Sequence, residues 1–150
     1  MPNRDLWESP DVVPSLAYDN VVAAVEWLQR VFGFRERVGA RLTWAGAMMT
    51  WMEIGDSLIN LSTSGGHHVF SPKNGERLTQ SLKVYVADVD QHFEHAKAEG
   101  ATIISAPEDG FWGGRIYRAT DLEGHLWEIS QRGRDLAAKD WKLPPGLTRS

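Results

Sequence analysis

The chain repeats one arrangement of elements at a fixed distance along its length. Residues 46–52 align with residues 114–120, and residues 56–62 align with residues 124–130, at an offset of 68 in both places (114 − 46 and 124 − 56). Few residues are identical, so the order and spacing of the elements carry the similarity. A duplicated module constrains the fold strongly, because both halves must form the same supersecondary unit.

Each half shows the same pattern of predicted elements. In the first half, a helical apolar stripe follows a capping Asp19 or Asn20 and stops at Gly33; in the second half, a helix runs from Asp88 to Gly100. Alternating apolar residues predict strands around both helices. The predicted strands are 12–18, 34–38, 41–45, 47–53 and 58–62, then 82–86, 102–105, 115–120 and 125–130, with a Pro/Gly loop at 106–113.

This order predicts an α+β fold made of two tandem βαβββ modules. A helix on one face of a mainly antiparallel sheet leaves the other face open, so we expect the two sheets to curl around a shared cavity with the helices outside. The predicted organisation is an N-terminal arm (1–11), a first module (12–63), a connector (64–80), a second module (81–131) and a C-terminal tail (132–150).

Composition excludes several classes of protein. The net charge of −4 argues against a nucleic-acid partner, which needs a basic face. No apolar run approaches the roughly 18 residues of a membrane span, and the first residues have no signal-peptide pattern. The chain has no cysteine, which excludes disulfides and zinc–thiolate sites. We therefore expect a cytoplasmic protein with no membrane partner.

Seven tryptophans in 150 residues suggest aromatic walls around a cavity, since flat rings bind flat apolar ligands by stacking. Packing in the core is the competing interpretation for any one of them. The loop 108–115 is the best candidate for a cavity rim, because its glycines allow it to bend and Phe111 and Trp112 can close over a ligand. The predicted ligand-binding residues are Trp44, Met49, Trp51, Asn60, Ser81, Lys83, Tyr85, Phe111, Trp112, Arg115, Tyr117 and Glu128.

Three segments resemble the vicinal oxygen chelate superfamily, which includes glyoxalase I, extradiol dioxygenases and bleomycin-resistance proteins. Residues 16–19 and 27–34 are similar to the strand–helix opening of that family, and residues 121–129 are similar to its closing D-P-x-G-x-x-W/I-E segment. The resemblance covers roughly residues 12–131. It implies a small-molecule ligand, a homodimer, and in the enzymes of the family one divalent metal.

The resemblance also implies where metal ligands would stand. The closing glutamate of the family corresponds to Glu128, its repeat partner is Asn60, and the two first-strand positions fall on Ser81 and Val13. Only Glu128 is a good ligand, whereas a catalytic metal site needs about three. We therefore expect neither a metal nor another cofactor, with a divalent metal as the alternative.

Three interpretations of Glu128 stay open. It can be paired with a cation such as Lys83 or Arg115, it can contact a ligand, or it can bind a metal or act as a catalytic acid or base.

The first functional hypothesis is a metal-free binding protein of the bleomycin-resistance type that holds a partly aromatic antibiotic or metabolite. The second is an enzyme, either a metal-dependent lyase, isomerase or dioxygenase or a metal-free catalyst that uses Glu128. The third is a regulatory or biosynthetic accessory protein that shares only the fold.

Overall fold

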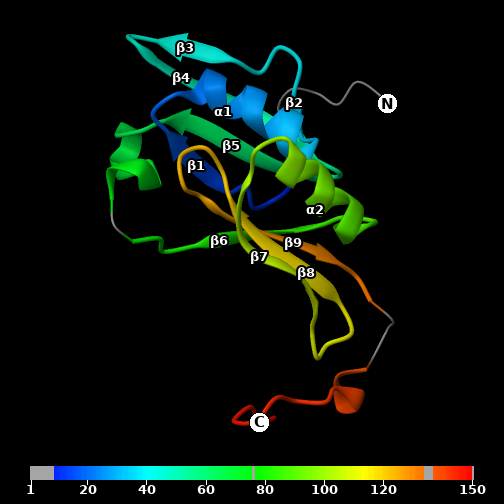
Figure 1. The fold of residues 1–150 in the computed structure, drawn as a ribbon. Helices are drawn as coiled ribbons and strands as arrows, with labels where there is room; N and C mark the ends of the chain where they lie inside the picture. The colour runs from blue at the N-terminus through cyan, green and yellow to red at the C-terminus, as the bar shows by residue number, and fades with distance from the viewer. Residues whose placement is uncertain (1–8, 76, 134–136, 150) are drawn as a thin grey trace. The chain divides into compact units, whose positions relative to one another are not determined.

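A computed structural model of the protein describes residues 9–75, 77–133 and 137–149 (Figure 1). The chain forms two compact units. The first contains the described residues up to Thr79 together with Asp121–His125, and the second contains Gln80–Thr120 and the described residues from Leu126 onward. The chain therefore returns to the first unit for five residues in the middle of the second, between Thr120 and Leu126.

The first unit is one sheet with a helix against one face (Figure 1). Its strands are ordered β1-β5-β4-β2, β3 pairs with β4, and β1 runs parallel to β5. Its elements are β1 (Ser15–Tyr18), α1 (Val21–Trp27), the π-helical turn η1 (Leu28–Phe32), β2 (Arg35–Glu36), β3 (Leu42–Trp44), β4 (Ala47–Ile54), β5 (Ser57–Thr63) and the short 3₁₀ turns η2 (Gly66–His68) and η3 (Pro72–Asn74).

Alternation along the strands separates the two faces of this sheet. Leu16, Met52 and Leu61 are fully buried and share the face on which α1 packs. Met49 and Asn60 point to the opposite face and are only half-buried. The helix covers one side and leaves the other open, as the sequence pattern predicts.

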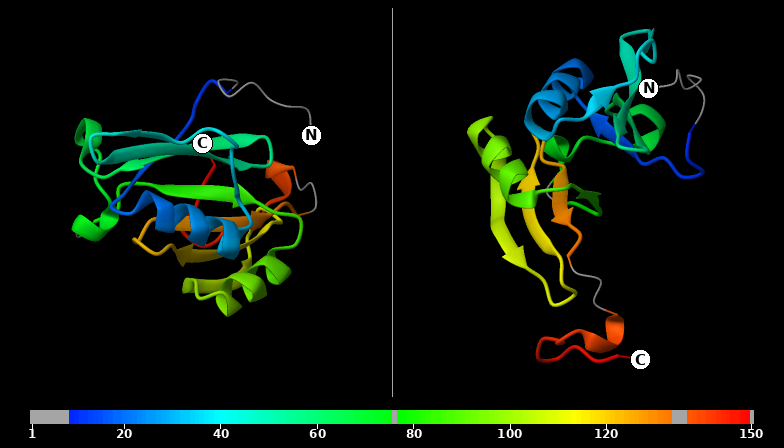
Figure 2. Two further views of the ribbon diagram at one scale, coloured as in Figure 1. Left: turned by 90° about the horizontal axis from the view of Figure 1, so that it is seen from above. Right: turned by 90° about the vertical axis from the view of Figure 1, so that its right-hand side faces the viewer.

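The second unit repeats this architecture with strand order β6-β9-β8-β7 and β6 parallel to β9. Figure 2 shows α2 along one face of its sheet. Trp127, Ile129 and Tyr117 are fully buried on that face. The elements are β6 (Ser81–Tyr85), α2 (Val89–Ala98), β7 (Thr102–Asp109), β8 (Arg115–Thr120), β9 (Leu126–Gln131) and the 3₁₀ turn η4 (Ala138–Asp140).

The start of α1 is completed by a distant part of the chain. Asn20 is the N-cap, and its side chain accepts from the Ala23 amide at 3.0 Å. In a capping box, a glutamate three residues after the cap bonds to the amide of the cap residue. Ala23 occupies that position, and Glu123 takes over the role, accepting from the amides of Asp19 at 2.7 Å and Asn20 at 3.0 Å.

The five-residue turn that carries Glu123 is buried in the first unit. One carboxylate oxygen of Asp121 accepts from the backbone amides of Glu123, Gly124 and His125, and the other accepts from the Tyr18 hydroxyl at 2.6 Å. Nε2 of His125 lies 2.8 Å from the Ala17 carbonyl oxygen. Asp121, Glu123 and His125 are all buried. This turn is therefore part of the core of the first unit.

The same turn changes the register of the repeat. Ser15 pairs with Asn60 and Lys83 with Glu128, which keeps the offset of 68 for β1/β6 and β5/β9. Trp51 pairs with Asn60 but Arg118 pairs with Glu128, so β4 and β8 are related by 67 (118 − 51). Between equivalent pairs, Thr120 and Leu126 enclose one residue more than Glu53 and Leu58 do. The ungapped alignment predicted from the sequence is thus wrong by one residue in β8.

Other predicted elements differ at their ends. The loop expected at 106–113 is shorter, because β7 continues to Asp109 through register shifts on either side of Ser105 that accommodate Pro107, which has no amide to donate. The predicted arm lies largely outside the described residues, and the predicted domain boundaries stay predictions. No helix in the described part of the chain is long and apolar enough to cross a membrane.

Glu123→Gln should destabilise the protein by about 2 kcal/mol, because hydrogen bonds to a charged acceptor contribute about 1.5–3 kcal/mol and the amide presents a donor to a backbone N–H. Urea denaturation followed by circular dichroism measures the change. Glu26→Gln, on the exposed side of α1, is the control and should stay within about 0.5 kcal/mol of the parent. Equal effects of the two substitutions would show that Glu123 does not cap α1.

Two carboxylates of the first unit should make stability depend on acidity. Burial alone raises the pKa of Glu53, but hydrogen bonds from Arg37 and Arg35 outweigh it and lower that pKa from its ordinary 4.5. Burial likewise raises the pKa of Glu36, and hydrogen bonds, mainly from Arg41, lower it overall. A depressed carboxyl pKa contributes stability above 4.5 that is lost as the pH falls through the folded-state value.

The unfolding free energy of Glu53→Gln should therefore fall less steeply below pH 4.5 than that of the parent. The total loss that the substitution removes should be under about 1 kcal/mol, because the ion pairs are partly exposed. Urea titrations at several pH values measure the slope. The exposed Glu94→Gln should keep the slope of the parent. An unchanged slope in Glu53→Gln contradicts the prediction.

Candidate functional site

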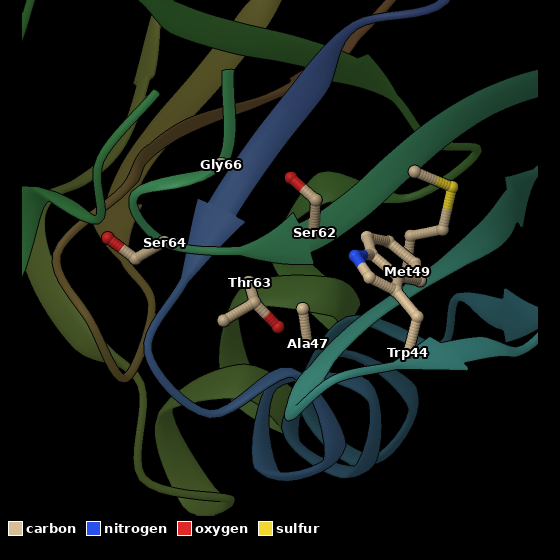
Figure 3. A pocket seen from close by; sticks show the side chains of 7 residues that line it. All are labelled: Trp44, Ala47, Met49, Ser62, Thr63, Ser64 and Gly66. Atoms are coloured by element: carbon tan, nitrogen blue, oxygen red, sulfur yellow. The ribbon is translucent and has the colours of Figure 1, made fainter. Parts of the chain in front are cut away.

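The open side of the first unit contains a pocket of about 230 Å³. Figure 3 shows that one part of its lining comes from the β3–β4 hairpin and another from the end of β5 and the loop that follows. The lining residues are Trp44, Ala47, Met49, Ser62, Thr63, Ser64 and Gly66. The pocket thus combines a flat aromatic group, a thioether and several small polar side chains.

A tight turn places Trp44 at this pocket. Ala45 and Gly46 have φ of 40° and 82°, the two positive values of a type I′ hairpin turn, which glycine adopts readily. The turn pairs Trp44 directly with Ala47, whose small side chain leaves space beside the indole. Trp44 stays 47% exposed although it is a large aromatic residue. An indole held this way on a strand can stack on a flat ligand.

The polar lining is partly engaged within the protein. The Thr63 hydroxyl accepts from the Met48 amide at 2.9 Å and donates to the Met48 carbonyl at 3.2 Å, and Ser64 Oγ accepts from the Ser71 amide at 2.8 Å. The described residues provide no hydrogen-bond partner for the Ser62 hydroxyl. Ser62 is therefore the side chain best placed to bond a polar atom of a ligand.

Next to the pocket on the same face lie two more of the predicted residues. Trp51 pairs with Asn60 across β4 and β5. Asn60 accepts from the Ser15 hydroxyl at 2.9 Å, and its amide nitrogen donates to the Thr50 carbonyl at 3.1 Å. Both ends of the Asn60 amide thus have protein partners that fix its orientation.

The open face of the second unit has a charged row in the equivalent place. Lys83, Glu128 and Arg118 lie side by side across β6, β9 and β8. Glu128 is 20% exposed and accepts from Arg118 Nε at 3.0 Å, while Ser81 Oγ lies 3.4 Å from its other oxygen. A cation partner was predicted for Glu128, but the partner is Arg118 rather than Lys83 or Arg115.

The predicted rim lies over part of this face. Phe111 and Trp112 sit in the turn between β7 and β8, with ring centroids 5.2 Å apart. Lys83 Nζ lies 5.8 Å from the centroid of the Trp112 ring, within the range of a cation–π interaction. Phe111 also packs edge-on against Trp141 at 5.7 Å, so the tail residue supports the rim.

Two predicted ligand-binding residues lie elsewhere. Tyr117 is fully buried against Phe93 of α2, its hydroxyl lies 2.7 Å from Nδ1 of His92, and burial raises its pKa. Arg115 pairs with Asp90 and Asp109. Both side chains belong to the helix side because of the one-residue register difference, so neither is placed to line the open face.

Sequence reasoning missed Arg118, the residue that replaces Tyr117 on the open face. The ungapped repeat sets Tyr117 opposite Met49, whereas the observed pairing sets Arg118 opposite Trp51. The available signal is the spacing between equivalent pairs. Five residues separate Thr120 from its partner Leu126, whereas four separate Glu53 from Leu58, and this difference shifts β8 by one position.

The donor set suits a transition metal poorly. Glu128 is the one carboxylate at the four positions that the resemblance points to, and a guanidinium already binds it. Asn60 has its amide engaged, Ser81 is a hydroxyl and Val13 has no donor atom. The described residues form no group of three or more His, Asp or Glu that could hold a metal. The residues present do not fit the metal of the family.

A family model described as the Glyoxalase/Bleomycin resistance protein/Dioxygenase superfamily matches residues 12–129. The chain belongs to this superfamily. The match includes both modules, and the two open mixed sheets, each with a helix on one face, agree with it.

Solved structures of the superfamily are similar over most of the chain. TioX from Micromonospora sp. ML1 is 35% identical, covers 85% of this chain and 100% of its own, and superposes with a TM-score of 0.64. The fosfomycin resistance protein FosX of Listeria monocytogenes, solved with Mn(II) and sulfate, is 17% identical over 85% of this chain and 95% of its own, with a TM-score of 0.63. The likeness to FosX shows the fold alone.

Curated relatives match a shorter segment. An uncharacterized protein of Mycobacterium bovis is 38% identical over 56 residues, which is 37% of this chain and 37% of that protein. A protein of Mycobacterium tuberculosis gives the same identity over 33% of its length. The chain thus matches only about a third of the length of these relatives.

Proposed function

We propose that the protein binds a small, partly aromatic compound, an antibiotic or a metabolite, without using a metal ion. The observation that carries this proposal is the exposed Trp44 indole at the wall of the open-face pocket, opposite the Ser62 hydroxyl and beside Met49. A flat ring can stack on the indole while Met49 adapts to its outline.

The volume of the pocket limits the size of the ligand that it can enclose. Small-molecule sites enclose about 300–1,000 Å³, and about 230 Å³ is somewhat less. We therefore expect the pocket to hold one ring system of the ligand rather than all of it. Trp51 and Asn60 on the same face are the next side chains within reach of the remainder.

The metal-free part of the proposal rests on Arg118. The guanidinium of Arg118 lies 3.0 Å from a Glu128 carboxylate oxygen, and its positive charge repels a divalent cation at the same carboxylate. The same ion pair argues against Glu128 as an acid or base, because a carboxylate that accepts from arginine is oriented toward that arginine.

The relatives support an antibiotic as one class of ligand. The matching family carries bleomycin resistance in its description, and FosX is named as a fosfomycin resistance protein. Fosfomycin has no aromatic ring, so the aromatic lining of this pocket favours a different compound. The homodimer and the cytoplasmic location inferred from the sequence stay predictions.

Trp44→Ala should weaken ligand binding about tenfold, since a good stacking pair contributes about 0.5–1.5 kcal/mol beyond the loss of buried area. A panel of aromatic antibiotics and metabolites is first screened by quenching of tryptophan fluorescence. Calorimetric titration of the compounds that bind then compares the parent with Trp44→Ala.

Val38→Ala is the control, because Val38 is 91% exposed in the same unit and lies outside the pocket lining. It should bind like the parent. If no member of a broad panel binds, or if Trp44→Ala binds as tightly as Val38→Ala, the proposed pocket is wrong.

Purified protein should contain far less than one Mn, Fe, Ni or Zn ion per chain, and Glu128→Ala should not change its metal content. Inductively coupled plasma mass spectrometry measures both. Stoichiometric metal that disappears in Glu128→Ala would overturn the metal-free proposal. The calorimetric titrations of Trp44→Ala would still test the pocket independently.

A further inference from the structure

The open face of the second unit carries two cations that have no acidic partner in the described part of the chain. Arg118 forms ion pairs with two carboxylates of this face: its Nε lies 3.0 Å from Glu128 Oε1, and its Nη1 lies 3.6 Å from Glu108 Oε1. Lys83 and Arg132 lie against aromatic rings instead. Both acids are thus paired with one arginine, and the described residues provide no acid for the other two positive charges.

The two cations are connected through β6, since Lys83 belongs to this strand and Arg132, which follows β9, lies over the ring of a β6 residue. Lys83 Nζ is 5.8 Å from the Trp112 ring centroid, and Arg132 Cζ is 4.1 Å from the ring centroid of Tyr85. Lys83 and Tyr85 are two residues apart on the same face of the strand, a spacing of about 6.6 Å. A small anion can therefore meet both positive groups at once.

A buried hydroxyl in the same cluster lacks a partner. Ser130 pairs with Tyr85 in the β6–β9 ladder and is only 2% exposed, and no described residue forms a hydrogen bond with its Oγ. Buried polar groups usually have a partner, so the Ser130 hydroxyl keeps hydrogen-bonding capacity that a ligand atom could use. This observation is independent of the two cations and points to the same place.

The backbone keeps the cluster compact. A side chain at Gly133 would collide with the carbonyl group of Gly113, so the chain leaving β9 lies directly against the turn that carries Trp112. Arg132 immediately precedes this close approach. Trp112 and Arg132 each directly precede one of the two glycines in this approach, so their backbones lie near each other.

We propose that Lys83, Arg132 and Ser130 form a site for the carboxylate or sulfonate of a small aromatic anion, whose ring lies against Trp112 and Tyr85. Ammonium and guanidinium groups supply charge-assisted hydrogen bonds to the anion, and the Ser130 hydroxyl gains its missing partner. This site lies wholly in the second unit and does not require the pocket at Trp44.

Calorimetric titration of the full-length protein with naphthalene-2-carboxylate and with its neutral amide, naphthalene-2-carboxamide, tests the proposal. The ring is the same in both probes, so the ratio of their affinities isolates recognition of the charge. We expect the carboxylate to bind at least about tenfold more tightly, and this ratio to shrink as salt is added.

Lys83→Gln and Arg132→Gln should each reduce the ratio several-fold, and together they should bring it to about one. Lys97→Gln is the matched control, because Lys97 also lies over an aromatic ring, at 5.7 Å from the Phe93 centroid, but on α2. It should leave the ratio unchanged. Circular dichroism checks that each variant is folded.

Ser130→Ala adds a second readout. It should weaken carboxylate binding while leaving the stability of the free protein unchanged or slightly higher, since it removes an unpaired buried hydroxyl.

Four results would overturn the proposal. They are equal affinity for the two probes, no saturable binding of the carboxylate at millimolar concentration, equal effects of Lys83→Gln and Lys97→Gln, and loss of the charge preference in Trp44→Ala alone. The last result would assign the anion to the first unit and leave the pocket there intact.

Discussion

The first unit depends on one carboxylate that comes from far along the chain. The Glu123 carboxylate accepts hydrogen bonds from the two backbone amides at the start of α1. A capping box would supply a nearby glutamate for this role, but Ala23 stands at that position. The Asp121 carboxylate shapes the turn that presents Glu123 and bonds Tyr18 beneath it. Burial and Asp121 together raise the Tyr18 pKa well above its ordinary value. The helix that covers the first sheet is thus anchored by a turn between two strands of the second.

The two halves have kept their architecture and diverged in the chemistry of their open faces. Equivalent rows across the sheets read Ser15, Asn60 and Trp51 in the first unit and Lys83, Glu128 and Arg118 in the second. The first row is neutral and aromatic, while the second is charged. An arginine on the second face binds the carboxylate at the position where the family has a metal ligand, so the two open faces now differ in their chemistry.

Much of the fold follows from local sequence, because alternation, N-caps and glycine stops are local signals. The sequence predicts the cap of α1 at Asp19 or Asn20, the cap of α2 at Asp88 and the stop at Gly33, and it predicts β8 to the residue. The register between distant strands is not local. One additional residue in a turn moved Tyr117 into the core and brought Arg118 to the surface, and no periodicity within β8 distinguishes these two arrangements, since its residues are buried on both faces.

The return of the chain to the first unit at Asp121–His125 also has a consequence for synthesis. Residues up to Thr79 leave the ribosome without the groups that bond Tyr18 and the start of α1, which lie 103 and 104 positions later in sequence. At about 5–20 residues per second, the missing turn is made several seconds later. During that time the nascent first half carries an incomplete helix start and an unfilled site in its core. Its folding is thereby tied to completion of the second half, and a duplication that looks like two independent modules matures as one.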